Sequence, residues 1–138
     1  MNPRSRPARL GLVGLIVIGI ALAAAGCERA RTIEIDIRYS HFEQAALSVP
    51  AGVPIRFVIV NRDPIDHEWI VGDEGVHQRH RTGTEPIHQS RPTEVSIAAG
   101  ATVETTVTFE RPGTLAFICH LPGHEVYGMI GRLTVTGR

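Results

Sequence analysis

The chain contains no lysine, so its basic side chains, apart from histidine, are all arginines. Three of the 14 arginines precede Cys27, whereas all 14 acidic residues follow it. Beyond Cys27 this leaves 11 arginines against 14 acidic residues, a formal charge of −3 with neutral histidines. A chain without a basic region offers no surface for nucleic acid, and we expect no nucleic-acid partner.

The sequence also lacks an apolar run of the about 20 residues that a membrane-spanning helix needs. Its apolar run from Leu10 to Ala25 follows the basic opening "MNPRSRPAR" and ends in small residues, as an export signal does. The residues "AAGC", Ala24–Cys27, resemble a bacterial lipobox, which would place a lipid on Cys27 and anchor the protein to a membrane. Cleavage after Ala25 by ordinary signal peptidase and an uncleaved anchor are the alternatives. All three predict a periplasmic or other extracytoplasmic location.

Cysteine is scarce, with two residues in the whole chain, Cys27 and Cys119. Small exported domains commonly pair their cysteines in disulfides. If Cys27 carries a lipid, Cys119 has no partner, and a lone thiol in an oxidising compartment is a liability unless it is buried or bound to metal. Cys119 is therefore a candidate metal ligand.

Convincing helical periodicity is missing from the whole chain beyond residue 26. Short alternating or β-branched runs occur instead, separated by Gly and Pro turns; examples are Thr32–Tyr39, Ile55–Val60 and His67–Gly72. About seven such runs predict an all-β sandwich. We expect a signal segment in residues 1–26, a tether in residues 27–31 and one folded domain in residues 32–138.

The segment Gly72–Thr93 interrupts this pattern, because it has little apolar content and contains three histidines, His77, His80 and His88. Long loops are uncommon in compact domains and tend to be functional. We expect a loop with solvated histidines. The alternative is that the spacing of His77 and His80 chelates a second metal ion at the surface.

The stretch "FICHLPGHEVYGM", Phe117–Met129, places Cys119, His124 and Met129 five residues apart. Thiolate and thioether are soft ligands and imidazole is borderline; a cysteine and two histidines with a weak axial methionine form the blue-copper arrangement. The second histidine must come from elsewhere in the chain. His67 is the candidate, because it begins a predicted strand directly after the turn "NRDPID".

Two segments, "VPAGVPIRFVIVN…HEW" and "ERPGTLAFICHLPGHEVYGMIGRLTV", resemble the cupredoxins, the family of plastocyanin and azurin. The resemblance extends over nearly all of residues 32–137. It implies a Greek-key β-sandwich, one type 1 copper ion and one-electron transfer. It also implies four copper ligands: His67, Cys119, His124 and Met129.

Two positions depart from the pattern of small electron-transfer cupredoxins. Glu68 stands where asparagine often follows the upstream histidine, and we expect its backbone N–H to donate to the sulfur of Cys119. His120, directly after Cys119, resembles part of the copper loop of multicopper oxidases, but the paired His-x-His motifs of those enzymes are absent. We expect the His120 side chain to face outward, away from copper, without a metal of its own.

These features favour an exported, monomeric electron carrier that is not an enzyme. Redox partner proteins would dock transiently near His124, Leu121 and Pro122. The alternative function is copper storage or delivery through the histidine-rich segment 72–93. A nitrosocyanin-like copper enzyme is less favoured, because Met129 occupies the axial spacing.

Overall fold

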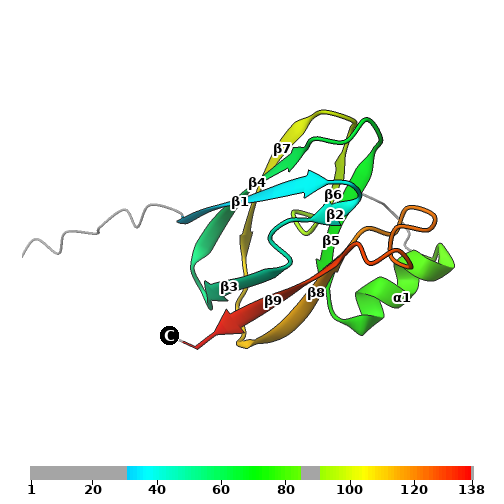
Figure 1. Ribbon diagram of the computed structural model, residues 1–138. Coiled ribbons are helices and arrows are strands. Elements are labelled where there is room, and N and C mark those ends of the chain that lie inside the picture. The colour runs from blue at the N-terminus through cyan, green and yellow to red at the C-terminus, as the bar shows by residue number, and fades with distance from the viewer. Residues whose placement is uncertain (1–30, 85–90, 138) are drawn as a thin grey trace, which may run out of the picture.

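In the computed structural model, which describes residues 31–84 and 91–137, two β-sheets pack against each other (Figure 1). The described elements are, in chain order, β1 (Arg31–Arg38), β2 (His41–Phe42), β3 (Ala46–Pro50), β4 (Pro54–Asn61), β5 (His67–Gly72), α1 (Glu74–Thr82), β6 (Glu94–Ile97), β7 (Thr102–Thr108), β8 (Gly113–Ile118) and β9 (Ile130–Thr136). One sheet has the strand order β2-β1-β4-β7 and the other β3-β9-β8-β5-β6. The predicted Greek-key β-sandwich is confirmed.

The strands β1 and β4 show why this sequence forms a sandwich. Side chains alternate between the two faces of a strand, so every second residue faces the other sheet. Ile35 and Ile37 of β1 are fully buried, as are Ile55, Phe57 and Ile59 of β4. The two strands lie side by side in parallel. Their alternating residues therefore form one continuous apolar face.

An aromatic layer lies under one end of the five-stranded sheet. Trp69 and Phe117 are fully buried, and their ring centroids are 6.3 Å apart. Gly131 of β9 faces the ring of Phe117, and a Cβ atom at this position would lie 2.0 Å from its Cζ atom, so no side chain fits there. Trp69 follows His67 by two residues and Phe117 precedes Cys119 by two, and residues two apart share one face of a strand. Both candidate ligands thus lie at the edge of a rigid core.

Helix α1 contradicts the expectation of an irregular loop over residues 72–93. The Asp73 side chain caps its first turn by accepting a hydrogen bond from the Val76 N–H at 3.0 Å. Gly83 ends the helix in the left-handed conformation, with φ of 65°. An Asp at the start and a Gly just past the end are ordinary helix boundary signals. They were present in the sequence, but without an apolar stripe they did not predict a helix.

The buried face of α1 consists of histidines. His77 and His80 lie three residues apart, which places them on the same side of a helix. Their exposed fractions are 1% and 8%, so the prediction that they are solvated is wrong. Because histidine counts as polar in any hydropathy pattern, this face gave no helical periodicity. The third histidine of the segment, His88, lies outside the described residues.

The predicted signal segment (residues 1–26), its lipid-bearing Cys27 and nearly all of the tether also lie outside the described residues. Within the part of the chain that the structure describes, no helix combines the length and apolarity needed to cross a membrane.

Candidate metal centre

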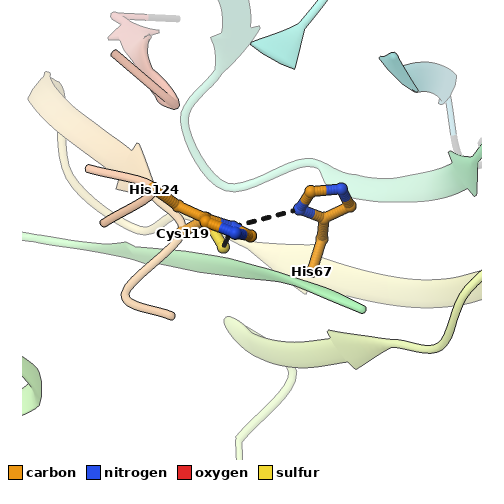
Figure 2. A group of neighbouring side chains, drawn as sticks. All are labelled: His67, Cys119 and His124. Atoms are coloured by element: carbon orange, nitrogen blue, oxygen red, sulfur yellow. Dashed lines mark hydrogen bonds between the residues drawn. The ribbon is translucent and has the colours of Figure 1, made fainter. Parts of the chain in front are cut away.

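Three metal-binding side chains converge at one end of the five-stranded sheet. His67 begins β5, Cys119 directly follows β8, and His124 lies in the loop between β8 and β9. Strands β5 and β8 are antiparallel neighbours, which brings the start of one next to the end of the other. One ligand atom from each of the three residues lies within 4.8 Å of the other two. Figure 2 shows the three side chains directed toward a common point.

The chemistry of these donors fits copper. The Sγ atom of Cys119 is 3.1 Å from the Nδ1 atom of His124, and this nitrogen is 3.3 Å from the Nδ1 atom of His67. His67 and Cys119 are fully buried, and His124 is half-buried. One soft sulfur and two borderline imidazole nitrogens are the donor set of a type 1 copper site. The cluster is therefore of the type 1 kind.

Asp63 fixes the orientation of the His67 ring. Its carboxylate accepts a hydrogen bond from the His67 Nε2–H at 2.9 Å and from the backbone N–H groups of Tyr39 and Ser40, each at 2.7 Å. Burial alone would raise the pKa of the Asp63 carboxyl, but these hydrogen bonds hold it below its usual range. Because Nε2 carries the hydrogen, the lone pair of His67 is on Nδ1, the nitrogen that faces the other two ligands.

Asn61 holds the turn that carries Asp63 and His67. Its Nδ2 donates to the carbonyl oxygens of Ile65 and Ala98, at 2.8 and 2.9 Å. Its Oδ1 accepts the backbone N–H of Asp63 at 3.0 Å. Sequence reasoning read this segment only as a turn and missed the role of both residues. Asn and Asp are common in turns for local reasons, so no sequence signal separates this role from an ordinary one.

The sulfur of Cys119 lies in a buried environment. Burial raises the pKa of its thiol, and N–H groups of Glu68 and Leu121 act in the opposite direction. The Glu68 N–H donates to Sγ at 3.3 Å, which confirms the predicted backbone contact. A metal ion would bind the deprotonated sulfur, and this N–H is then placed to stabilise the charge.

Backbone hydrogen bonds connect the two ends of the loop between β8 and β9. The Cys119 N–H donates to the Met129 carbonyl at 3.2 Å, and the Met129 N–H donates to the His124 carbonyl at 3.0 Å. Met129 is fully buried. Burial also lowers the pKa of His124, which favours the neutral ring that binds metal. The loop therefore brings Cys119, His124 and Met129 to the same end of the sandwich.

His120 lies apart from this cluster, against helix α1. Its Nε2 atom is 2.9 Å from the Nδ1 atom of His77, and its ring stacks on that of His80 with centroids 5.4 Å apart. His120 faces away from the ligand cluster, as expected, but the expectation that it faces outward is wrong, because only 4% of its side chain is exposed. The helix that sequence reasoning did not predict covers it.

Comparisons with known proteins agree with this geometry. Residues 11–135 match the family model of the cupredoxin-like domain. Copper-resistant cuproprotein CopI of Pseudomonas aeruginosa is 27% identical over 177 aligned positions, which cover 94% of this chain and 98% of that protein. Auracyanin-B of Chloroflexus aurantiacus is 32% identical over 110 positions, covering 69% of this chain and 47% of that protein.

Solved auracyanin structures are similar to this fold. A structure of auracyanin B superposes with a TM-score of 0.65 at 29% identity, covering 78% of this chain and 89% of that one. Auracyanin A of Chloroflexus aurantiacus, described as a "blue" copper protein, superposes with a TM-score of 0.60 at 26% identity, covering 76% of this chain and 98% of that one.

Proposed function

The chain belongs to the cupredoxin-like family, whose cofactor is copper, and from this premise we propose that it is an exported type 1 copper protein that carries single electrons between redox partners. We propose one copper ion with four ligands: His67, Cys119, His124 and Met129. The proposed protein is a monomer and not an enzyme.

The observation that carries this proposal is the convergence of a buried thiol and two Nδ1 atoms within 4.8 Å. Zinc also accepts cysteine and histidine, but the buried Met129 at the end of the same loop favours copper, for which thioether is a natural ligand. A nitrosocyanin-like enzyme would need an open coordination position, and Met129 as the axial ligand would fill that position.

The protein contributes a ligand geometry that changes little during electron transfer. A bound copper ion supplies the one-electron chemistry, alternating between Cu(I) and Cu(II). Asp63 holds the ring of His67, and the Glu68 N–H holds the sulfur of Cys119. The aromatic layer beneath the site keeps water away from the ligands.

The proposed route for electrons is the half-buried ring of His124, the ligand nearest the surface. Around it the loop presents Pro122, Val126 and Tyr127, of which the last two are 88% and 76% exposed. A small apolar surface of this kind fits transient docking, which typically buries less than about 1,200 Å². We therefore propose that redox partners dock here, near Leu121 and Pro122.

The proposed location is the periplasm or another extracytoplasmic face, with a lipid on Cys27. The support is the signal-like segment before Cys27. The free thiol of Cys119 is compatible with an oxidising compartment, because the residue is buried.

The test is an optical and EPR spectrum of the copper-loaded protein together with the copper content. We expect an intense blue absorption from the thiolate–copper bond that disappears on reduction with ascorbate and returns on reoxidation. Cys119→Ser removes the thiolate, so the blue band should be lost.

The second cysteine supplies a matched control. Cys27→Ser should keep the full blue band, because Cys27 is not a proposed ligand. A blue band that survives in Cys119→Ser, or a wild-type copper complex without colour, would show that the ligand set is wrong.

Copper storage or delivery is the second candidate function. The name of the CopI relative and the buried histidines of α1 favour it. The two functions differ in what leaves the protein: an electron carrier exchanges electrons with ferricyanide and retains its copper, whereas a delivery protein transfers copper to an acceptor. Copper transfer to a competing chelator that is faster than electron exchange would favour delivery.

A further inference from the structure

A second group of histidines lies between helix α1 and the loop that joins β8 to β9, which are neighbours in Figure 1. The group consists of His77 and His80 from the helix and His120 from the start of the loop. The ring centroids of His77 and His120 are 5.2 Å apart, and those of His80 and His120 are 5.4 Å apart. All three side chains are almost completely buried. Burying three imidazoles is costly unless their polar atoms are used.

Each of the three rings directs one nitrogen to an oxygen atom that can only accept a hydrogen bond. For His77 the contact is Nε2 to the carbonyl oxygens of Gly72 and Ala116, at 3.2 and 3.3 Å. For His80 it is Nδ1 to the carbonyl of Val76 at 2.9 Å. These nitrogens therefore carry the hydrogen, and in a neutral ring the other nitrogen has the lone pair.

The third ring, His120, directs Nδ1 to a carboxylate oxygen of Glu125 at 3.3 Å. Arg81 binds this carboxylate with contacts of 2.7, 3.0 and 3.1 Å. Arg81 pairs with Glu125 as a carboxylate, and an acceptor-only carboxylate beside Nδ1 favours the His120 tautomer that carries its hydrogen on Nδ1. The lone pair of His120 is then on Nε2.

The inner nitrogens of His77 and His120 consequently face each other. The Nδ1 atom of His77 and the Nε2 atom of His120 are 2.9 Å apart. A proton shared between them makes this contact a hydrogen bond, and a metal ion can take the place of that proton. Two nitrogens that are each about 2.0–2.1 Å from one metal ion, at a right angle, lie about 2.9 Å apart. Burial lowers the pKa of the His77 ring, which favours the neutral form that metals bind.

We propose that His77, His80 and His120 form a second copper site, separate from the type 1 ligand cluster. His77 and His120 are the preformed pair, and the ring of His80, stacked on that of His120, is the third imidazole beside them. The hydrogen bonds of His77 and His80 to carbonyl oxygens, and the carboxylate beside His120, match the surroundings that orient metal-binding histidines.

Three imidazoles without a thiolate favour copper over other divalent ions of the first row, following the Irving–Williams order. The site goes beyond the proposed electron transfer function, and it adjoins the type 1 cluster, because His120 follows Cys119 and Glu125 follows His124 in the chain.

The experiment is a titration of the metal-free full-length protein with copper(II). Its readouts are the absorption spectrum, the EPR spectrum and the amount of bound copper. The blue band reports the first equivalent and shows that the protein is folded. We expect a second equivalent that adds no blue absorption and gives a separate EPR signal with nitrogen couplings. If the blue band fails to form, the type 1 proposal fails; if the blue band forms but only one equivalent binds, the second site is absent.

Glutamine variants test the residues, with the blue band as the internal control for folding. The double variant His77→Gln/His120→Gln should bind one equivalent and stay blue. His80→Gln should weaken the second equivalent by at least about tenfold. His41→Gln is the matched control, because His41 is exposed and lies in β2 outside the group, and it should still bind two equivalents.

Two further results would overturn the assignment. A second equivalent that persists unchanged in the blue double variant would place that copper elsewhere. Displacement of the second copper by an equal concentration of zinc(II), with the blue band intact, would show that the site prefers zinc.

Discussion

Asp63 shows how one residue outside the ligand set shapes the proposed copper site. Its carboxylate joins the His67 ring to the backbone of Tyr39 and Ser40. These two residues connect β1 to β2 in the four-stranded sheet. In Asp63→Asn the negative charge is lost and the hydrogen bond to His67 Nε2 weakens. We expect copper(II) affinity to fall by about 10–100-fold while the blue band remains, as measured by chelator competition.

Asp66 is the matched control for Asp63. It lies in the same turn, is exposed, and its side chain accepts the Ala99 N–H at 2.9 Å without contacting His67. Asp66→Asn should leave the copper affinity unchanged. Equal affinities for the Asp63→Asn and Asp66→Asn variants would mean that Asp63 does not orient the ligand.

At the scale of the element, the stability of helix α1 depends on the capping residues at its two ends, because the helix has no apolar face. Asp73 supplies the N-terminal cap, and Gly83 supplies the C-terminal one. Asp73→Ala should lower the free energy of unfolding by about 0.5–2 kcal/mol, measured by urea denaturation. Fraying of the first turns also displaces His77, so the second copper equivalent should bind more weakly, while the blue band persists.

Gln78→Ala is the control for the helix. Gln78 is an exposed residue of the same element, and alanine favours helices at least as well as glutamine. This variant should keep both the stability and the second copper equivalent. Unchanged stability in Asp73→Ala would contradict the capping role.

At the scale of the whole molecule, the proposed copper site connects segments far apart in the chain. His67 and His124 are separated by 57 residues, and only folding brings them together. An ion that binds the folded state alone stabilises it by about 4 kcal/mol at 1,000 times its dissociation constant. For a domain of this size, copper should therefore raise the Tm by more than about 10 °C.

Differential scanning calorimetry with and without copper measures this shift, and a chelator should reverse it. Cys119→Ser should lose most of the shift, whereas Cys27→Ser should retain it. A Tm that does not respond to copper would contradict tight binding by the folded state.

Local patterns in the sequence were sufficient for the fold class and for the candidate ligands. Alternation in runs such as Ile33–Ile37 depends only on the geometry of a strand, so the strands and the sandwich could be predicted. Cys119, His124 and Met129 lie in one short loop, and their donor types alone indicate copper. The short strands β2 and β3 were missed, because two to five residues carry too little periodicity.

The tertiary structure decided what surrounds those residues. Asp63 orients His67 through contacts between elements that no local pattern describes. His120 meets His77 and His80 only because α1 packs on the loop after β8, and the helix itself was hidden because its buried face is polar. Pairing between distant segments has no signature in either segment alone, so the second group of histidines is a property of the folded chain.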